Sequence, residues 1–124
     1  MYTDKVIEEF KNPSNLGKLE NADARGEVGN VTCGDMLYVY IKVKNNKITD
    51  IKVETFGCVA AVATSSMLTK LVKGKTLEEA EKVTKEQIAK ELGGLPPIKL
   101  HCSTLAVDGL KKAIENYRTK MQPS

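Results

Sequence analysis

Apolar and polar residues alternate with a period of two over residues 35–44 and again over residues 47–56. The apolar positions are Leu37, Val39, Ile41 and Val43 in the first run, and Ile51 and Val53 in the second. This period is typical of a strand with one side in the core and one side in water. Asn45 and Asn46 separate the runs, and asparagine tolerates the positive φ of a tight turn. The pattern predicts a β-hairpin, and residues 25–30 predict a short additional strand.

Helical spacing precedes and follows this β region. The first predicted helix covers residues 3–10, and the residues expected on its apolar face are Val6, Ile7 and Phe10. Either Thr3 or Asp4 can cap it, because both side chains accept hydrogen bonds from free helix N–H groups. Residues 58–74 are small and apolar on nearly all sides, which predicts a buried helix that ends at Gly74.

Two short helices are expected over residues 76–83 and 84–92, since each segment opens with a capping-box pattern. The capping pairs are Thr76 with Glu79 and Thr84 with Gln87. The second helix should stop at Gly93 and Gly94. Residues 95–100 contain two prolines, which remove hydrogen-bond donors and favour extended backbone, so this segment is predicted to be non-helical.

The last predicted helix covers residues 103–121 and is capped by Ser103 or Thr104. Its apolar face consists of Leu105, Ala106, Gly109, Leu110, Ala113, Ile114 and Tyr117. Strands that precede most of the helices favour an α+β fold. We expect one domain, residues 1–124, with a small three-stranded antiparallel sheet, helices packed on one face and a C-terminal helix.

Composition excludes several classes of function. Hydrophobic residues make up 41% of the chain and charged residues 28%, as in an ordinary globular domain. The net charge of +3 is mild, and lysines alternate with acids, so there is no basic stripe for nucleic acid. No apolar run approaches the ~20 residues that span a bilayer, and the charged N-terminus is not a signal peptide. We expect a cytoplasmic protein, or a matured organellar form, with no membrane partner.

The three cysteines lie at the ends of predicted elements rather than within them. Cys33 lies just before the first strand of the hairpin, Cys58 at the first turn of the buried helix and Cys102 at the first turn of the last helix. Helix N-termini stabilise thiolates, the form of cysteine that binds metal and attacks sulfur. This placement makes reactive or metal-binding cysteines more plausible than three inert, buried ones. His101 and Asp35 offer a fourth donor, and such a set fits both tetrahedral zinc and an iron–sulfur cluster.

Four motifs occur in a fixed order along the chain: "NPSNLG" at 12–17, "CGD" at 33–35, "FGC" at 56–58 and "LPPIKLHCSTLAVDGLKKAI" at 95–114. With these motifs the chain resembles the IscU / NifU N-terminal family over nearly its whole length. Members of that family are scaffold proteins on which iron–sulfur clusters are assembled. The order of "CGD", "GC" and "LPPIKLHCS" is highly specific, so the resemblance implies an iron–sulfur cluster scaffold rather than an enzyme.

The resemblance also implies roles for individual residues. Cys33, Cys58 and Cys102 would be the thiolate ligands of a transient [2Fe–2S] cluster. Asp35 would contribute to the lability of that cluster, and either Asp35 or His101 would be the fourth ligand to iron. Cys102 would be the first acceptor of sulfur, which arrives as a persulfide. Zinc can occupy the same site in the apo form.

Several partners follow from the same resemblance. They are a pyridoxal-phosphate cysteine desulfurase, a ferredoxin or other electron donor, acceptor apoproteins and an Hsp70-type chaperone. The segment expected to bind the chaperone consists of Leu95, Pro96, Pro97, Ile98 and Lys99, with Ile98 where the family commonly has Val. Tyr2 matches a tyrosine linked to dimer contacts in relatives, which implies a homodimer through the N-terminus.

Two other functions compete with the scaffold. A zinc-dependent sulfur acceptor of the SufU type would use the same pocket without building clusters. Those relatives carry an insertion between the second and third cysteines and Arg before the last, whereas here the link is short and His101 is present. A cysteine–histidine hydrolase is disfavoured, because adjacent residues such as His101 and Cys102 often point apart and no oxyanion loop is evident.

Overall fold

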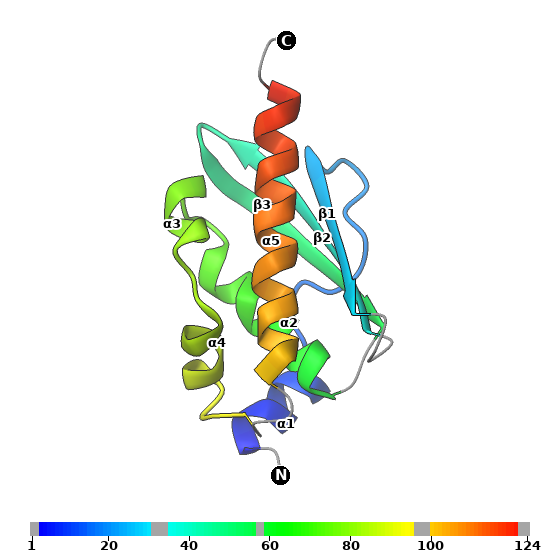
Figure 1. The fold of residues 1–124 in the computed structure, drawn as a ribbon, viewed down its shortest axis with the longest axis vertical. Helices are drawn as coiled ribbons and strands as arrows, with labels where there is room; N and C mark the ends of the chain where they lie inside the picture. Colours follow the sequence, from blue (N-terminus) through cyan, green and yellow to red (C-terminus); the bar gives the residue numbers. More distant parts are fainter. Residues whose placement is uncertain (1–2, 31–34, 57–58, 96–99, 122–124) are drawn as a thin grey trace.

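The computed structural model describes residues 3–30, 35–56, 59–95 and 100–121. Its elements in chain order are α1 (Asp4–Lys11), β1 (Ala24–Asn30), β2 (Asp35–Lys44), β3 (Lys47–Phe56), α2 (Val59–Val72), α3 (Leu77–Glu81), α4 (Lys85–Glu91) and α5 (Leu100–Met121). The strands form one antiparallel sheet in the order β1-β2-β3 (Figure 1). The predicted α+β architecture with a C-terminal helix is confirmed.

The hairpin between β2 and β3 forms where the sequence predicts it. Asn45 and Asn46 adopt positive φ values of 53° and 65°, the backbone that a two-residue hairpin turn requires. The register pairs Ile41 with Ile51 and Val39 with Val53, so these apolar residues share one face of the sheet. All four side chains are fully buried. The alternation in the sequence therefore identifies the core face of the sheet correctly.

Helices α2 and α5 cover that face of the sheet (Figure 1). Helix α5 packs mainly on β1 and β2, and α2 packs on β3 and against α5. No helix within the described ranges is both long and apolar enough to cross a bilayer.

A close approach between backbones sets the position of α5 on β1. A Cβ atom at Gly26 would overlap the carbonyl oxygen of Gly109 and would lie 2.5 Å from the backbone nitrogen of Ala113. Only glycine at position 26 lets the helix lie this close to the strand. The Asn116 amide also donates a 2.7 Å hydrogen bond to the Arg25 carbonyl. Helix and strand therefore have a fixed relative position.

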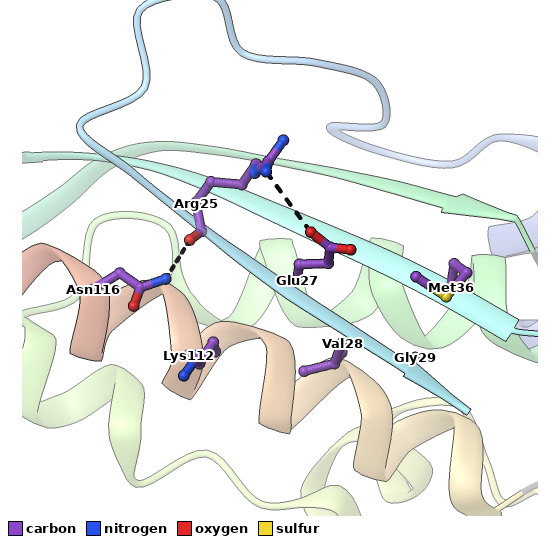
Figure 2. Close-up of a pocket in the computed structure, with 7 residues that line it drawn as sticks. All are labelled: Arg25, Glu27, Val28, Gly29, Met36, Lys112 and Asn116. Carbon is purple, nitrogen blue, oxygen red and sulfur yellow. Dashed lines mark hydrogen bonds and ion pairs between the residues drawn. The ribbon is translucent and has the colours of Figure 1, made fainter. Parts of the chain in front are cut away.

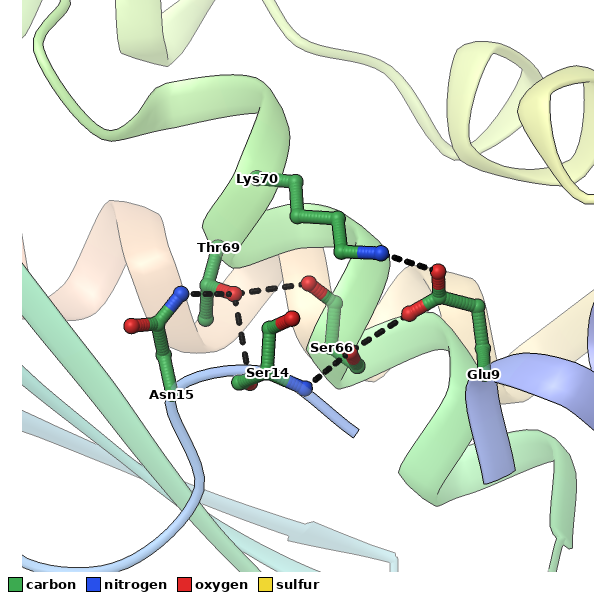
Figure 3. Close-up of polar contacts among 6 residues, drawn as sticks. All are labelled: Glu9, Ser14, Asn15, Ser66, Thr69 and Lys70. Atoms are coloured by element: carbon green, nitrogen blue, oxygen red, sulfur yellow. Dashed lines mark hydrogen bonds and ion pairs between the residues drawn. The ribbon is translucent and has the colours of Figure 1, made fainter. Parts of the chain in front are cut away.

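Helix α1 is held to α2 by polar contacts as well as by apolar packing (Figure 3). Glu9 is buried and accepts hydrogen bonds from the Ser66 hydroxyl, at 2.6 Å, and from the Lys70 ammonium group. Phe10 is 41% exposed, so the prediction that it lies on the buried face of the helix is wrong. The neighbouring Glu9 is buried, and Ser66 and Lys70 satisfy its carboxylate there.

The short helices confirm the predicted caps in part. Thr76 and Glu79 form the complete capping box of α3, with hydrogen bonds in both directions. At α4 the Thr84 hydroxyl accepts from the Gln87 backbone, which is one half of the predicted box. Gly93 and Gly94 follow α4 with φ values of 77° and 107°, in agreement with the predicted stop.

The last helix begins earlier than the sequence indicates. Helix α5 starts at Leu100, so neither Ser103 nor Thr104 caps it. Ser103 is instead fully buried within the helix. The predicted non-helical segment therefore ends before Leu100, and the backbones of His101 and Cys102 belong to the first helical turn.

Candidate metal centre

The sheet brings two of the cysteine-containing connections to one end of the molecule. Asn30 at the end of β1 pairs with Asp35 at the start of β2, and Met36 pairs with Phe56 at the end of β3. Cys33 belongs to the connection between β1 and β2, and Cys58 to the connection between β3 and α2. Both connections therefore start and finish at the same end of the sheet.

The direction of α5 brings its N-terminus to that end as well. Asn116 bonds to Arg25, whereas Gly109, two turns earlier in the helix, lies against Val28 and Leu37. The helix therefore runs antiparallel to β1, and its first turn points toward the end of β1 at Asn30. Figure 1 shows the first turns of α2 and α5 at the same end of the molecule as these strand ends.

This arrangement favours negatively charged ligands. Helices α2 and α5 have 14 and 22 residues and both begin at this end. The N-terminus of a helix carries unpaired N–H groups and about half a positive charge. Two such termini at one end favour thiolates, carboxylates and sulfide over neutral or cationic groups.

The predicted ligands themselves are described only as far as the backbone. Asp35 is the first residue of β2, and His101 and Cys102 lie in the first turn of α5. Cys33 and Cys58 lie outside the described residues, and so does Tyr2. Among the side chains that the structure describes, no group of three or more His, Cys, Asp or Glu could hold a metal ion. The ligand set therefore stays a prediction.

The predicted chaperone segment is described at its first residue only. Leu95 is half-buried and packs against Ala60 and Ala61 in the first turn of α2. The other four residues, 96–99, lie outside the described ranges. The contact connects the start of this segment to the helix that follows Cys58, and the sequence contains no local signal that predicts it.

Sequence reasoning also missed the groove between β1 and α5. It has a volume of about 420 Å³ and is lined by Arg25, Glu27, Val28, Gly29, Met36, Lys112 and Asn116 (Figure 2). The two glycines in "RGEVGN" could have indicated that another element lies close to this strand, because glycine within a strand often marks a close backbone approach.

The protein is a small α+β domain with a three-stranded antiparallel sheet, and its cysteine-containing connections lie at one end of that sheet. Comparison with known proteins places it more narrowly: the chain belongs to the NifU-like N terminal domain family, whose model matches residues 1–123. The resemblance inferred from the sequence motifs is thereby confirmed.

Individual relatives are similar over nearly the whole chain. Iron-sulfur cluster assembly scaffold protein IscU 1 of Archaeoglobus fulgidus is 58% identical over 120 residues, covering 97% of this chain and 78% of the relative. The IscU scaffold protein of Azotobacter vinelandii is 48% identical and covers 96% of this chain and 95% of the relative.

Solved structures agree with the fold. A protein from Fervidobacterium islandicum AW-1, described as an iron-sulfur cluster assembly scaffold protein for the SUF system, superposes with a TM-score of 0.76 at 26% identity, covering 91% of this chain and 96% of that one. The N-terminal part of a NifU-like protein from Brucella abortus has the same TM-score of 0.76 at 23% identity, covering 95% of this chain and 94% of that one, and supports the fold alone.

Proposed function

We propose that this protein is a scaffold on which iron–sulfur clusters are assembled and from which they pass to acceptor apoproteins. One observation carries the proposal. Both cysteine-containing connections and the first turn of α5 lie at the same end of the fold. Relatives named as IscU scaffolds, at 47–58% identity over nearly the full chain, support it.

Cys33, Cys58 and Cys102 are the proposed thiolate ligands of a [2Fe–2S] cluster. Either Asp35 or His101 supplies the fourth donor, which makes the site less stable than one with four thiolates. A carboxylate is a hard ligand and a poorer match than a thiolate for this soft site. Such mixed ligation suits a protein that must release its cluster. Zinc is the expected alternative occupant when iron is absent.

Sulfur enters as a persulfide on a cysteine desulfurase. The Cys102 thiolate attacks the terminal sulfur of that persulfide, a new S–S bond forms on Cys102, and the desulfurase thiolate leaves. Two electrons from a ferredoxin or similar donor then cleave the new S–S bond, which releases sulfide and restores the Cys102 thiolate. The position of Cys102 in the first turn of α5 supports this role, because the helix N-terminus favours the thiolate.

Release of the cluster is proposed to involve residues 95–99 and an Hsp70-type chaperone. Leu95 packs against Ala60 and Ala61, so a partner that draws this segment away removes an apolar contact from the first turn of α2. The connection that holds Cys58 precedes that turn directly. A homodimer through Tyr2 and a cytoplasmic location complete the proposal.

Anaerobic reconstitution tests the function. The apo protein is incubated with ferrous iron, cysteine and a cysteine desulfurase, and visible absorption is followed. We expect charge-transfer bands of a [2Fe–2S] cluster, and their loss in Cys33→Ser, Cys58→Ser and Cys102→Ser. Lys111→Ala, an exposed change on α5, is the control that should assemble normally. Absence of the bands in the unchanged protein would refute the scaffold function.

The likeness to a SUF-system structure keeps a zinc-dependent sulfur acceptor as the second candidate. That function predicts stoichiometric zinc that survives chelation, together with failure to bind iron under the same anaerobic conditions. Zinc in a purified sample does not distinguish the two functions, because a pocket with three thiolates binds zinc in either case.

A further inference from the structure

The two edges of the sheet differ in how their backbone groups are used. Along the outer edge of β3, Val53 donates to the Asn15 carbonyl and accepts from Gly17, both at 2.9 Å. Farther along the same edge, Ile48 donates to Lys75 at 2.8 Å and accepts from Gly74 at 2.7 Å. Two segments of the chain therefore cover this edge, as expected for a protein that avoids uncontrolled strand pairing.

The orientation of β1 follows from its contacts with β2. Ile41 accepts from the backbone of Asp23, and Val43 donates to the Asp23 carboxylate, both at 2.8 Å. Odd-numbered residues of β2 therefore point their backbone groups toward β1. The register pairs Ile41 with Ala24, which makes the even-numbered residues of β1 the ones that bond to β2.

Arg25, Glu27 and Gly29 consequently point their backbone groups away from the sheet. The carbonyl of Arg25 accepts the hydrogen bond from Asn116. Within the described ranges, no hydrogen bond engages the backbone groups of Glu27 or Gly29, and both residues are exposed. The edge of β1 is thus open at the two positions nearest to the connection that holds Cys33.

The groove along this edge is favourable for negative charge. Figure 2 shows β1 between the Arg25 and Glu27 side chains on one side and the Lys112 and Asn116 side chains of α5 on the other. Arg25 is 3.7 Å from Glu27 and partly neutralises it. Lys112 is exposed and has no ion-pair partner within the described part of the chain. The groove therefore carries one uncompensated positive charge, on a protein whose net charge is +3.

We propose that the open edge of β1 binds an extended, acidic segment of a partner protein by strand addition. The partner strand would exchange backbone hydrogen bonds with Glu27 and Gly29, and one of its carboxylates would pair with Lys112. A second copy of this chain is the poorer occupant, since it brings the same net positive charge. The packing of Gly26 against α5 holds β1 in place before a partner binds, so binding costs little conformational entropy in this protein.

This surface lies beside the proposed metal centre but contains none of its ligands. A bound strand would follow β1 to Asn30 and so approach the connection that holds Cys33. The inference goes beyond the scaffold function, because it concerns how a partner is held and requires no bound iron. It can be tested on the apo protein, so that failure of cluster assembly and failure of strand binding are separate results.

The probe is a seven-residue peptide with Glu at every second position and Thr or Val at the positions between. Its binding is measured by titration calorimetry at low salt, with a chelator present to keep the protein free of metal. We expect binding to the unchanged protein, and slower exchange of the Glu27 and Gly29 amides when the peptide is present. Glu27→Pro removes an outward N–H together with the Glu27 carboxylate and leaves the N–H groups that bond to β2 in place. It should weaken binding about three- to tenfold while the β1–β2 ladder stays intact. Glu27→Gln controls for the lost carboxylate.

A second part of the experiment tests the role of charge in binding. Lys112→Glu should weaken binding of the acidic peptide at least about threefold, whereas Lys111→Glu, a neighbour outside the groove, should have little effect. The proposal is overturned if no binding occurs up to about 1 mM, if a Lys-containing version of the peptide binds equally well, or if protection maps away from β1. Equal effects of both lysine variants, or self-association that Glu27→Pro abolishes, would also overturn it.

Discussion

The contact between Gly26 and α5 makes a quantitative prediction about stability. In Gly26→Ala the new Cβ would lie 2.5 Å from the Ala113 backbone nitrogen and still closer to the Gly109 carbonyl oxygen. Both are backbone atoms, so the whole helix must move away by about 1 Å to restore normal contact distances near 3.5 Å. Overpacking of this kind costs about 3 kcal/mol, the upper part of the usual range.

Gly109→Ala is the informative comparison from the other side of the same contact. Its Cβ would meet the tips of two side chains, Leu37 Cδ2 at 2.6 Å and Val39 Cγ2 at 2.9 Å, which can move. Alanine also favours the helix over glycine by about 1 kcal/mol, which offsets part of the strain. We expect a net destabilisation of about 1 kcal/mol. Gly29→Ala, at an exposed position on the same strand, should change stability by less than about 0.5 kcal/mol.

Thermal unfolding followed by circular dichroism measures these differences. At about 2.1 cal/mol/K per residue, the unfolding entropy of a 124-residue chain is about 0.26 kcal/mol/K. A loss of about 3 kcal/mol then lowers the Tm of Gly26→Ala by about 12 °C, against about 4 °C for Gly109→Ala. A Tm for Gly26→Ala within about 2 °C of the unchanged protein would refute the reasoning, as would a larger loss in Gly109→Ala.

Three further predictions concern the metal centre, the α1–α2 contact and acid stability. Asp35→Ala should hold a reconstituted cluster longer than the unchanged protein in a transfer assay to an apo-ferredoxin, and an equal or shorter lifetime would contradict the proposed role of Asp35. Glu9→Ala leaves the buried Ser66 hydroxyl without its acceptor and should lower the free energy of unfolding in urea by about 1–3 kcal/mol, so an unchanged midpoint would show that α1 docks without this contact. Hydrogen bonds from the backbone and then the side chain of Thr76 lower the pKa of Glu79 below its ordinary 4.5. Because the folded-state pKa is the lower one, this contribution is present above pH 4.5 and is lost as pH falls through the folded value. Thr76→Ala removes the side-chain hydrogen bond and keeps the larger backbone one, so it should make stability slightly less steeply dependent on pH in that acidic range. Identical pH profiles would contradict a contribution from the Thr76 side chain.

The candidate site could be predicted from the sequence in part. Cys33, Cys58 and Cys102 lie at element ends, and the order of their motifs identifies the family before any tertiary contact is known. The sequence does not show that the separate connections share one end of the sheet. That result depends on the pairing of Asn30 with Asp35 and on the direction of α5 along β1.

Local pattern by itself determined the hairpin, the capped helices and the family of this protein. These features depend on residues close in sequence: alternation fixes a strand face, Asn45 and Asn46 fix a turn, and Thr76 with Glu79 fixes a helix start. Errors occurred where burial depends on residues distant in sequence. Phe10 was expected on the apolar face but is 41% exposed, whereas Glu9 is buried because the Ser66 and Lys70 side chains of α2 satisfy its carboxylate.

Only the tertiary structure decided which surfaces remain open. Segments distant in sequence cover the β3 edge at Ile48 and Val53, whereas α5 engages the β1 edge at Arg25 and leaves Glu27 and Gly29 free within the described residues. No local pattern encodes this difference, because every strand has the same backbone donors and acceptors. Whether a strand edge is used depends on where the rest of the chain packs, and that packing is decided by contacts across the whole domain.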